Sequence, residues 1–129
     1  MSSEILAFIL ILMIFFHIVD DYYLQGILSK MKQSSWWKEN APEPLYKYDY
    51  IVALIMHAFS WSFMIMLPWI MFTSFTLITP WIVLFLINVG VHALVDHLKA
   101  NMKKINLVAD QGLHLIQILL SWTVMMLCL

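Results

Sequence analysis

Charged side chains are scarce in this chain of 129 residues, and arginine is absent. Asp, Glu and Lys together make up 12% of the residues, about half the share found in an ordinary soluble domain. The chain has one cysteine, Cys128, and a formal net charge of −1. The single cysteine excludes a disulfide scaffold, and the charge balance argues against a nucleic-acid-binding protein. The low charge also excludes a soluble enzyme with its own water-facing domain.

Apolar residues account for 63% of the chain, and the mean hydropathy is +0.85. The 46 residues from Tyr50 to Val95 contain no Asp, Glu, Lys or Arg. At about 1.5 Å per helical residue, this stretch covers roughly twice the ~30 Å hydrocarbon thickness of a bilayer. It is therefore predicted to form a helical hairpin that crosses a membrane twice.

Two further apolar segments flank the hairpin, so residues 1–129 are predicted to form a single transmembrane domain, an all-α up-down bundle of four helices. The predicted spans are residues 5–25, 50–72, 80–100 and 110–129. All seven lysines lie in or beside the connections 26–49 and 100–109. Lysine-rich connections favour the cytoplasmic side, which places both termini on the non-cytoplasmic side. Because segment 26–49 also contains several Trp and Tyr residues, we expect it to lie along the cytoplasmic interface.

The few ionisable residues of the apolar segments follow a regular pattern. All five histidines and four of the five aspartates lie inside the predicted spans or at their cytoplasmic ends. An acid at a helix centre costs about 2.5–3.5 kcal/mol on insertion scales, so these carboxylates need compensation. Three spans each contain a His and an Asp four residues apart, which puts both side chains on one helix face. These pairs are His17 with Asp21, His92 with Asp96, and Asp110 with His114.

The three pairs also share one depth in the predicted bundle. Successive helices run in opposite directions, so unrelated residues would scatter to both membrane surfaces. The pairs and His57 instead fall within roughly 10 Å of the cytoplasmic boundary. Imidazole and carboxylate groups are suitable ligands for Zn²⁺, Mn²⁺ or Fe. We therefore predict a site for one or two divalent ions, preferably zinc, with His17, Asp21, His57, His92, Asp96, Asp110 and His114 as ligands.

Further polar residues lie beside these ligands. Asn88 and Lys99 lie on the helix face of His92, so Asn88 is expected to orient a ligand and Lys99 to offer its ammonium to an oxyanion or phosphate. Gln25 and Gln111 are expected to support the ligands from the second shell.

Two other ionisable residues, Asp20 and His97, lie off the helix faces of the three pairs. Asp20 lies about 60° to one side of the His17 and Asp21 face, which leaves it open as an extra ligand, a base or a solvated acid at the helix end. Asp20 and Lys99 are the candidate catalytic residues. His97 is about 140° around the helix from His92, and we place it outside the site.

A divalent ion in such a site makes bound water acidic enough to supply hydroxide near neutral pH, which predicts a membrane-embedded metal-dependent hydrolase. The basic connections attract an anionic lipid headgroup or phosphate. The expected substrate is a phosphoester or phosphoanhydride of a lipid or nucleotide, and an amide or peptide bond stays open.

Four other interpretations remain. The His and Asp residues could hold helices together without further function, or form a proton or metal-ion pathway, although the outer halves of the spans contain nothing ionisable. A bis-histidine haem is less compatible with the neighbouring carboxylates and only three glycines. The chain could also be a small membrane scaffold, and its apolar outer faces leave homo-oligomers open.

Taken together, the motifs resemble those of the small bacterial and phage membrane proteins of domain-of-unknown-function family 3307, across essentially the whole chain. The chain has Asp20 where this family often has Ala, and Tyr22 in place of Phe. It is more distantly similar to SOS-regulated membrane-bound metal-dependent hydrolases. The resemblance implies the four-span architecture, the same site residues and the cytoplasmic membrane of a bacterium, including a phage-infected one. The matching motifs are His17-x-x-x-Asp21-Tyr22-x-Leu24-Gln25, His57, His92-x-x-x-Asp96-x-x-Lys99 and Asp110-Gln111-x-x-His114.

Overall fold

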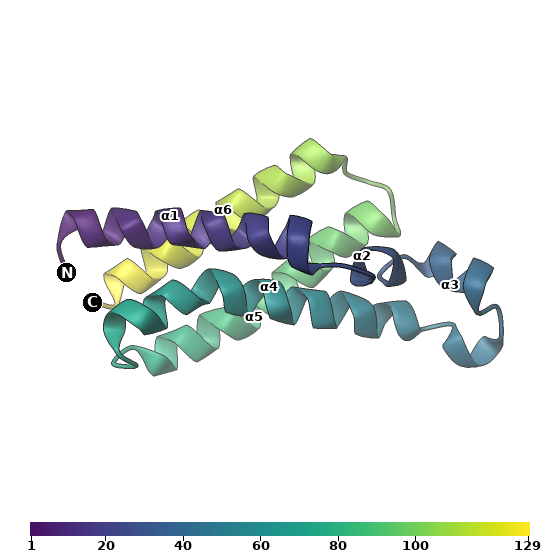
Figure 1. Ribbon diagram of the computed structural model, residues 1–129, viewed down its shortest axis with the longest axis horizontal. Coiled ribbons are helices and arrows are strands. Elements are labelled where there is room, and N and C mark those ends of the chain that lie inside the picture. The colour runs from purple at the N-terminus through teal and green to yellow at the C-terminus, as the bar shows by residue number, and fades with distance from the viewer.

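The computed structural model describes all 129 residues, which form helices and no strands. Four long helices lie side by side: α1 (Ser3–Val19), α4 (Asp49–Thr73), α5 (Ile78–Ala100) and α6 (Leu107–Leu127) (Figure 1). The connection from α1 to α4 contains the π-helical turn η1 (Asp20–Leu24), α2 (Leu28–Met31), α3 (Ser34–Asn40) and the 3₁₀ turn η2 (Pro44–Tyr46). Both chain termini lie at one end of the bundle, and α2, α3 and the α5–α6 connection lie at the other (Figure 1).

The predicted all-helical class with four long apolar helices is confirmed. Four stretches are long and apolar enough to cross a membrane: Ser3–Leu24, Pro44–Thr73, Ile78–Ala100 and Leu107–Leu127. The first of them continues from α1 into η1 without a break in the helical path.

Local sequence signals account for several helix ends. The Ser2 side chain accepts a hydrogen bond from the Ile5 amide and caps α1, and the Asn106 side chain does the same for α6 through the Ala109 amide. Ser74 adopts a left-handed conformation with φ 49° and ends α4. Pro80 lies in the first turn of α5, where its missing N–H removes no helical hydrogen bond.

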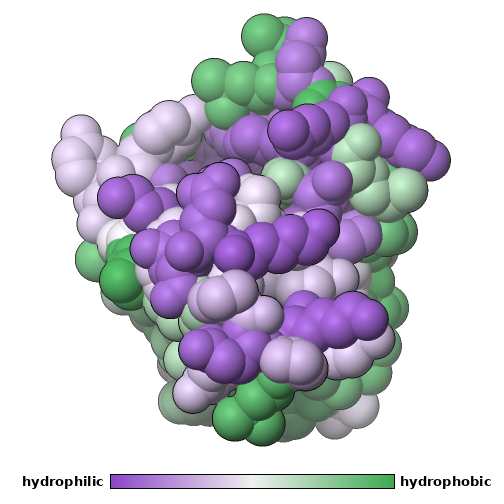
Figure 2. Space-filling view, turned by 90° about the vertical axis from the view of Figure 1, so that its right-hand side faces the viewer, coloured by the Kyte–Doolittle hydropathy of each residue, from purple (hydrophilic) through white to green (hydrophobic).

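The apolar core occupies the half of the bundle nearer the termini. It contains two residues of α1, four of α4, two of α5 and two of α6: Ile9, Met13, Trp61, Ile65, Met66, Trp69, Trp81, Phe85, Ile118 and Met125. The opposite end of the molecule is different. Figure 2 looks onto the end that carries α2, α3 and the α5–α6 connection, and its surface there is largely hydrophilic. The buried His and Asp residues lie between this end and the apolar core.

One glycine allows the chain to turn back after the first helix. Gly26 has φ +50° and lies between η1 and α2, and the turn lets α2 pack against α4. A residue with a Cβ atom adopts this left-handed conformation at a cost of roughly 1–2 kcal/mol.

We expect Gly26→Ala to lower the free energy of unfolding by about 1 kcal/mol, because alanine must adopt the left-handed conformation. Thermal unfolding in detergent micelles measures the change. Gly90→Ala is the matched control, since Gly90 lies in regular helix and an added Cβ meets nothing within 4 Å. Equal stability of the two variants would contradict a required left-handed turn at Gly26.

Candidate metal centre

All four long helical stretches supply buried His and Asp side chains to one cluster. The cluster consists of Asp20 and Asp21 from η1, His57 from α4, His92 and Asp96 from α5, and Asp110 and His114 from α6. The first and last members of the cluster, Asp20 and His114, are 94 positions apart in the chain.

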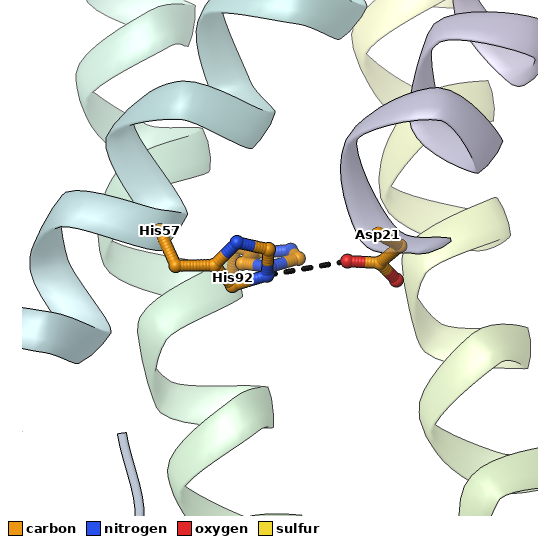
Figure 3. A group of neighbouring side chains, drawn as sticks. All are labelled: Asp21, His57 and His92. Atoms are coloured by element: carbon orange, nitrogen blue, oxygen red, sulfur yellow. Dashed lines mark hydrogen bonds and ion pairs between the residues drawn. The ribbon is translucent and has the colours of Figure 1, made fainter. Parts of the chain in front are cut away.

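The first group of ligand atoms belongs to Asp21, His57 and His92, and these atoms lie within 4.8 Å of one another. Nε2 of His57 lies 3.2 Å from Nε2 of His92 and 3.2 Å from Oδ1 of Asp21. Figure 3 shows the Asp21 carboxylate facing the two imidazoles across the space between the helices. With zinc–ligand bonds of about 2.0–2.1 Å, tetrahedral geometry separates neighbouring ligand atoms by about 3.3 Å. The observed separations are therefore close to those of a zinc site.

The second group consists of His92, Asp96 and His114, again with ligand atoms within 4.8 Å of one another. Nε2 of His114 lies 3.6 Å from Oδ1 of Asp96, and Nε2 of His92 lies 3.8 Å from Oδ2 of the same carboxylate. Oδ2 of Asp96 is also 3.5 Å from Nε2 of His57. Because His92 belongs to both groups, they form one continuous cluster.

Two predicted ligands, His17 and Asp110, lie beside these groups and not within them. Nδ1 of His17 accepts a hydrogen bond from Nε1 of Trp61 at 2.8 Å, and its Nε2 lies 3.1 Å from Oε1 of Gln111. A tryptophan N–H can only donate, so Nε2 of His17 carries the proton and donates to Gln111. Both ring nitrogens are therefore engaged. Asp110 accepts a hydrogen bond from Lys99 at 2.6 Å.

Lys32, predicted only to mark the cytoplasmic side, contacts the cluster directly. Its Nζ lies 2.5 Å from Oδ2 of Asp96, and the lysine is buried. The side chain of Asn101 accepts from the Ser34 amide at 2.7 Å and donates to the Lys32 carbonyl at 2.9 Å. These bonds hold the segment after α2 against the end of α5. Lys32 lies in a connection and on no predicted helix face, so helical spacing could not reveal its contact with Asp96, 64 residues away.

Asp20 lies behind His57, on the side of the ring that faces away from His92. Its Oδ2 lies 3.5 Å from Nδ1 of His57, and its Oδ1 accepts from the Ser60 hydroxyl at 2.6 Å. The Oδ2 oxygen makes no hydrogen bond, so its contact with His57 is electrostatic. Asp20 is buried, so it is not a solvated acid at the helix end. Ser60, which the sequence analysis does not single out, holds Asp20 in turn.

Both glutamines proposed as supporting residues contact the cluster. Nε2 of Gln25 lies 2.9 Å from Nε2 of His57. Gln111 donates to Oδ2 of Asp21 at 3.0 Å and to Oδ2 of Asp110 at 3.1 Å. Gln111 thus connects the carboxylates of η1 and α6.

Two residues of α5 lie elsewhere. Asn88 was expected to orient a ligand, but it donates to Ser121 at 2.9 Å and accepts from Gln117 at 2.8 Å, one turn closer to the apolar core. These bonds join α5 to α6 and involve none of the predicted ligands. His97 stacks on Tyr50 with ring centroids 6.2 Å apart, outside the cluster.

A cavity of about 370 Å³, here called the polar cavity, extends from the hydrophilic end of the bundle to Asp21 and Asp96. Its lining includes three lysines and three glutamines: Lys32, Lys99, Lys103, Gln25, Gln33 and Gln111. The Lys99 side chain is 33% exposed while its ammonium contacts Asp110. Asp21 and Asp96 therefore line a cavity whose other polar residues are mainly lysines and glutamines.

The buried charges of the cluster do not balance. The four carboxylates are matched by only two ammonium groups, those of Lys32 and Lys99. With all four carboxylates ionised and the imidazoles neutral, two negative charges remain. Buried polar atoms without a hydrogen-bond partner also lie here: Oδ2 of Asp20, Nδ1 of His92, Oδ1 of Asp110, and Nδ1 and Nε2 of His114. Of these, Nε2 of His114 faces the carboxylates of Asp96 and Asp110. One divalent cation would therefore balance the two charges and take this nitrogen as a ligand.

No family model, curated protein or solved structure matches the chain. The family resemblance drawn from the sequence motifs stays a prediction.

The hydrogen bond between Trp61 and His17 gives a test of how the cluster is held. We expect Trp61→Phe to lower the free energy of unfolding by about 1–3 kcal/mol more than Trp69→Phe, because only the first substitution leaves a buried partner unpaired. Both tryptophans are fully buried, and Nε1 of Trp69 has no partner to lose. Equilibrium unfolding in detergent compares them, and equal losses would show that the bond contributes nothing.

Proposed function

We propose that the chain is an integral membrane protein whose four long helices cross the bilayer. All seven lysines lie at or near the end with α2, α3 and the α5–α6 connection, which favours this end for the cytoplasmic side and the opposite side for both termini. The motif resemblance favours the cytoplasmic membrane of a bacterium, including a phage-infected host cell. The apolar outer faces of the helices suit direct contact with lipid.

Within that membrane we propose a metal-dependent hydrolase that acts on a phosphoester or phosphoanhydride. The observation that carries this proposal is the convergence of three imidazoles and two carboxylates from four helical segments. The two carboxylates, those of Asp21 and Asp96, also line the cavity that contains the lysines. Zinc is the preferred ion, and manganese or iron are alternatives. The two unbalanced negative charges and the shared His92 favour one ion over two.

A bound divalent ion would supply a hydroxide nucleophile from water near neutral pH. In the overall reaction, the hydroxyl of water bonds to phosphorus, the bond from phosphorus to the leaving oxygen breaks, and the leaving oxygen takes the remaining proton. Lys99 lines the polar cavity and would offset charge on the phosphoryl oxygens. Asp20 would keep Nε2 of His57 directed at the cluster, and Gln111 would hold Asp21.

Non-catalytic metal or proton handling is the second candidate. The pairing of Lys32 with Asp96 favours proton handling, because an ammonium already balances this carboxylate without an ion. An ion pathway predicts flux across liposomes that depends on voltage or pH. A hydrolase predicts no such flux.

We expect protein purified in detergent to bind about one equivalent of zinc. His92→Ala and Asp96→Ala should abolish this binding, because His92 belongs to both ligand groups and Asp96 contacts three histidines. His97→Ala is the matched control and should retain the ion, since His97 lies outside the cluster. Elemental analysis gives the stoichiometry, and metal-replete wild-type protein without bound metal would end the proposal.

The hydrolase itself is tested by phosphate release from a lipid phosphomonoester and from a soluble one. Release should require the ion and fall by at least about 100-fold in His92→Ala, with His97→Ala close to wild type. A metal-loaded protein that releases no phosphate from either compound would leave a metal site without this activity.

Lys32 and a divalent ion would compete for the same oxygen of Asp96. Lys32→Met should therefore tighten zinc binding by about tenfold, which corresponds to ~1.4 kcal/mol. Lys30→Met is the matched control, because Lys30 is exposed and contacts no cluster residue. Competition with a chelator measures both affinities. Weaker zinc binding by Lys32→Met would mean that the lysine supports the site and does not oppose it.

A further inference from the structure

A second cavity adjoins the polar cavity at the side of the bundle. This α1–α6 groove has a volume of about 530 Å³ and is lined by Ile14, His17, Ile18, Tyr22, Tyr23, Gln111 and Leu115. Tyr22 and Gln111 line both cavities. The two cavities therefore meet at these two residues, and a ligand that occupied both would pass along Tyr22 and Gln111.

The groove is apolar and runs along the helices. Ile14, Ile18 and Tyr22 follow one another at intervals of four residues on α1 and η1, so the groove extends about 12 Å from the hydrophilic end toward the middle of the bundle. Ile18 and Leu115 are 44% and 40% exposed, so the groove is open on its outer side. In a bilayer this outer side faces the acyl chains, which also run along the helix direction.

The polar cavity matches the phosphate headgroup of a phospholipid, and the apolar groove matches an acyl chain. The polar cavity is lined by three lysines and two aspartates, and this excess of positive charge suits a phosphate. Lys32 and Lys99 already pair with Asp96 and Asp110, so Lys103 is the lysine that a phosphate meets without a competing ion pair. Five of the seven residues that line the groove are hydrophobic, and the two nitrogens of His17 are already bonded. A nucleotide would leave the groove unfilled, whereas a lipid fills both cavities.

We propose that the polar cavity and the α1–α6 groove together bind one membrane lipid with a phosphate headgroup. The phosphate lies against the lysines, and one acyl chain leaves past Tyr22 and Gln111 into the groove. The identity of this lipid as the substrate rests on the proposed function. Its binding does not, because it requires neither a metal ion nor turnover.

Titration of detergent-purified protein with dioleoyl phosphatidic acid, followed by native mass spectrometry, tests the binding. We expect one bound lipid per chain. Dioleoylglycerol, which lacks the phosphate, and glycerol 3-phosphate, which lacks the chains, should each bind at least about tenfold more weakly. Equal binding of glycerol 3-phosphate would overturn the proposal in favour of a free phosphate site.

Two pairs of variants locate the lipid. Ile18→Trp fills the groove and Lys103→Gln removes a charge from the polar cavity, and each should weaken binding by about tenfold. Their controls are Leu86→Trp, at a 62% exposed residue that lines no cavity, and Lys30→Gln. Leu115→Trp on the opposite wall repeats the groove test if Ile18→Trp does not fold. Equal effects of the variants and their controls would show non-specific association.

The same variants separate this inference from the hydrolase. Lipid that binds in the groove of a protein without phosphatase activity would contradict the proposed function and leave the lipid site standing. The opposite outcome is that Ile18→Trp and Leu115→Trp change neither lipid binding nor the hydrolysis of a soluble phosphoester. This outcome would contradict the lipid site and leave the proposed function standing.

Discussion

Four carboxylates inside an apolar helical bundle impose the main energetic demand on this structure. A buried ionised acid is costly unless it is paired and hydrogen-bonded. Each acid of the cluster meets this demand differently: Asp96 with Lys32, Asp110 with Lys99, Asp20 with Ser60, and Asp21 with Gln111. These four pairings join the helices at the hydrophilic end of the bundle. Even the short helix α2 contributes, because it places Lys32 at the end of α5.

The sequence could predict the core of the cluster because two regularities act together. Helical periodicity places residues four apart on one face, and alternating helix direction assigns each pair a depth. Asp21, His92, Asp96 and His114 meet both conditions, and His57 meets the second. The structure brings all five together. Asn88 shows the limit of this reasoning. It lies on the same face as His92, but a difference of one turn in depth places it among the polar residues of α6 instead.

The contacts that the sequence could not predict involve side chains from the connections or from apolar helix faces. Lys32 reaches Asp96 only because Gly26 turns the chain back and Asn101 holds the following segment. Trp61 has no polar pattern of its own, since it belongs to an apolar helix face, yet it donates to His17. Adjacent acids on a regular α-helix would diverge by about 100°. Asp20 and Asp21 instead both reach the interior from the π-helical turn η1, where each contacts His57.

The distribution of the cluster over every long helix has a consequence for biogenesis. Asp21 of η1 is synthesised about ninety residues before Gln111, its partner in α6, emerges from the ribosome. During that interval the nascent first helical stretch holds this carboxylate without its final neighbour. In the proposed membrane orientation, Asp21 lies at the last turn of that stretch and would stay hydrated at the membrane surface while translation continues. The cluster would then close only when α6 packs against the other helices, and α6 would be the step that commits the bundle to its native packing.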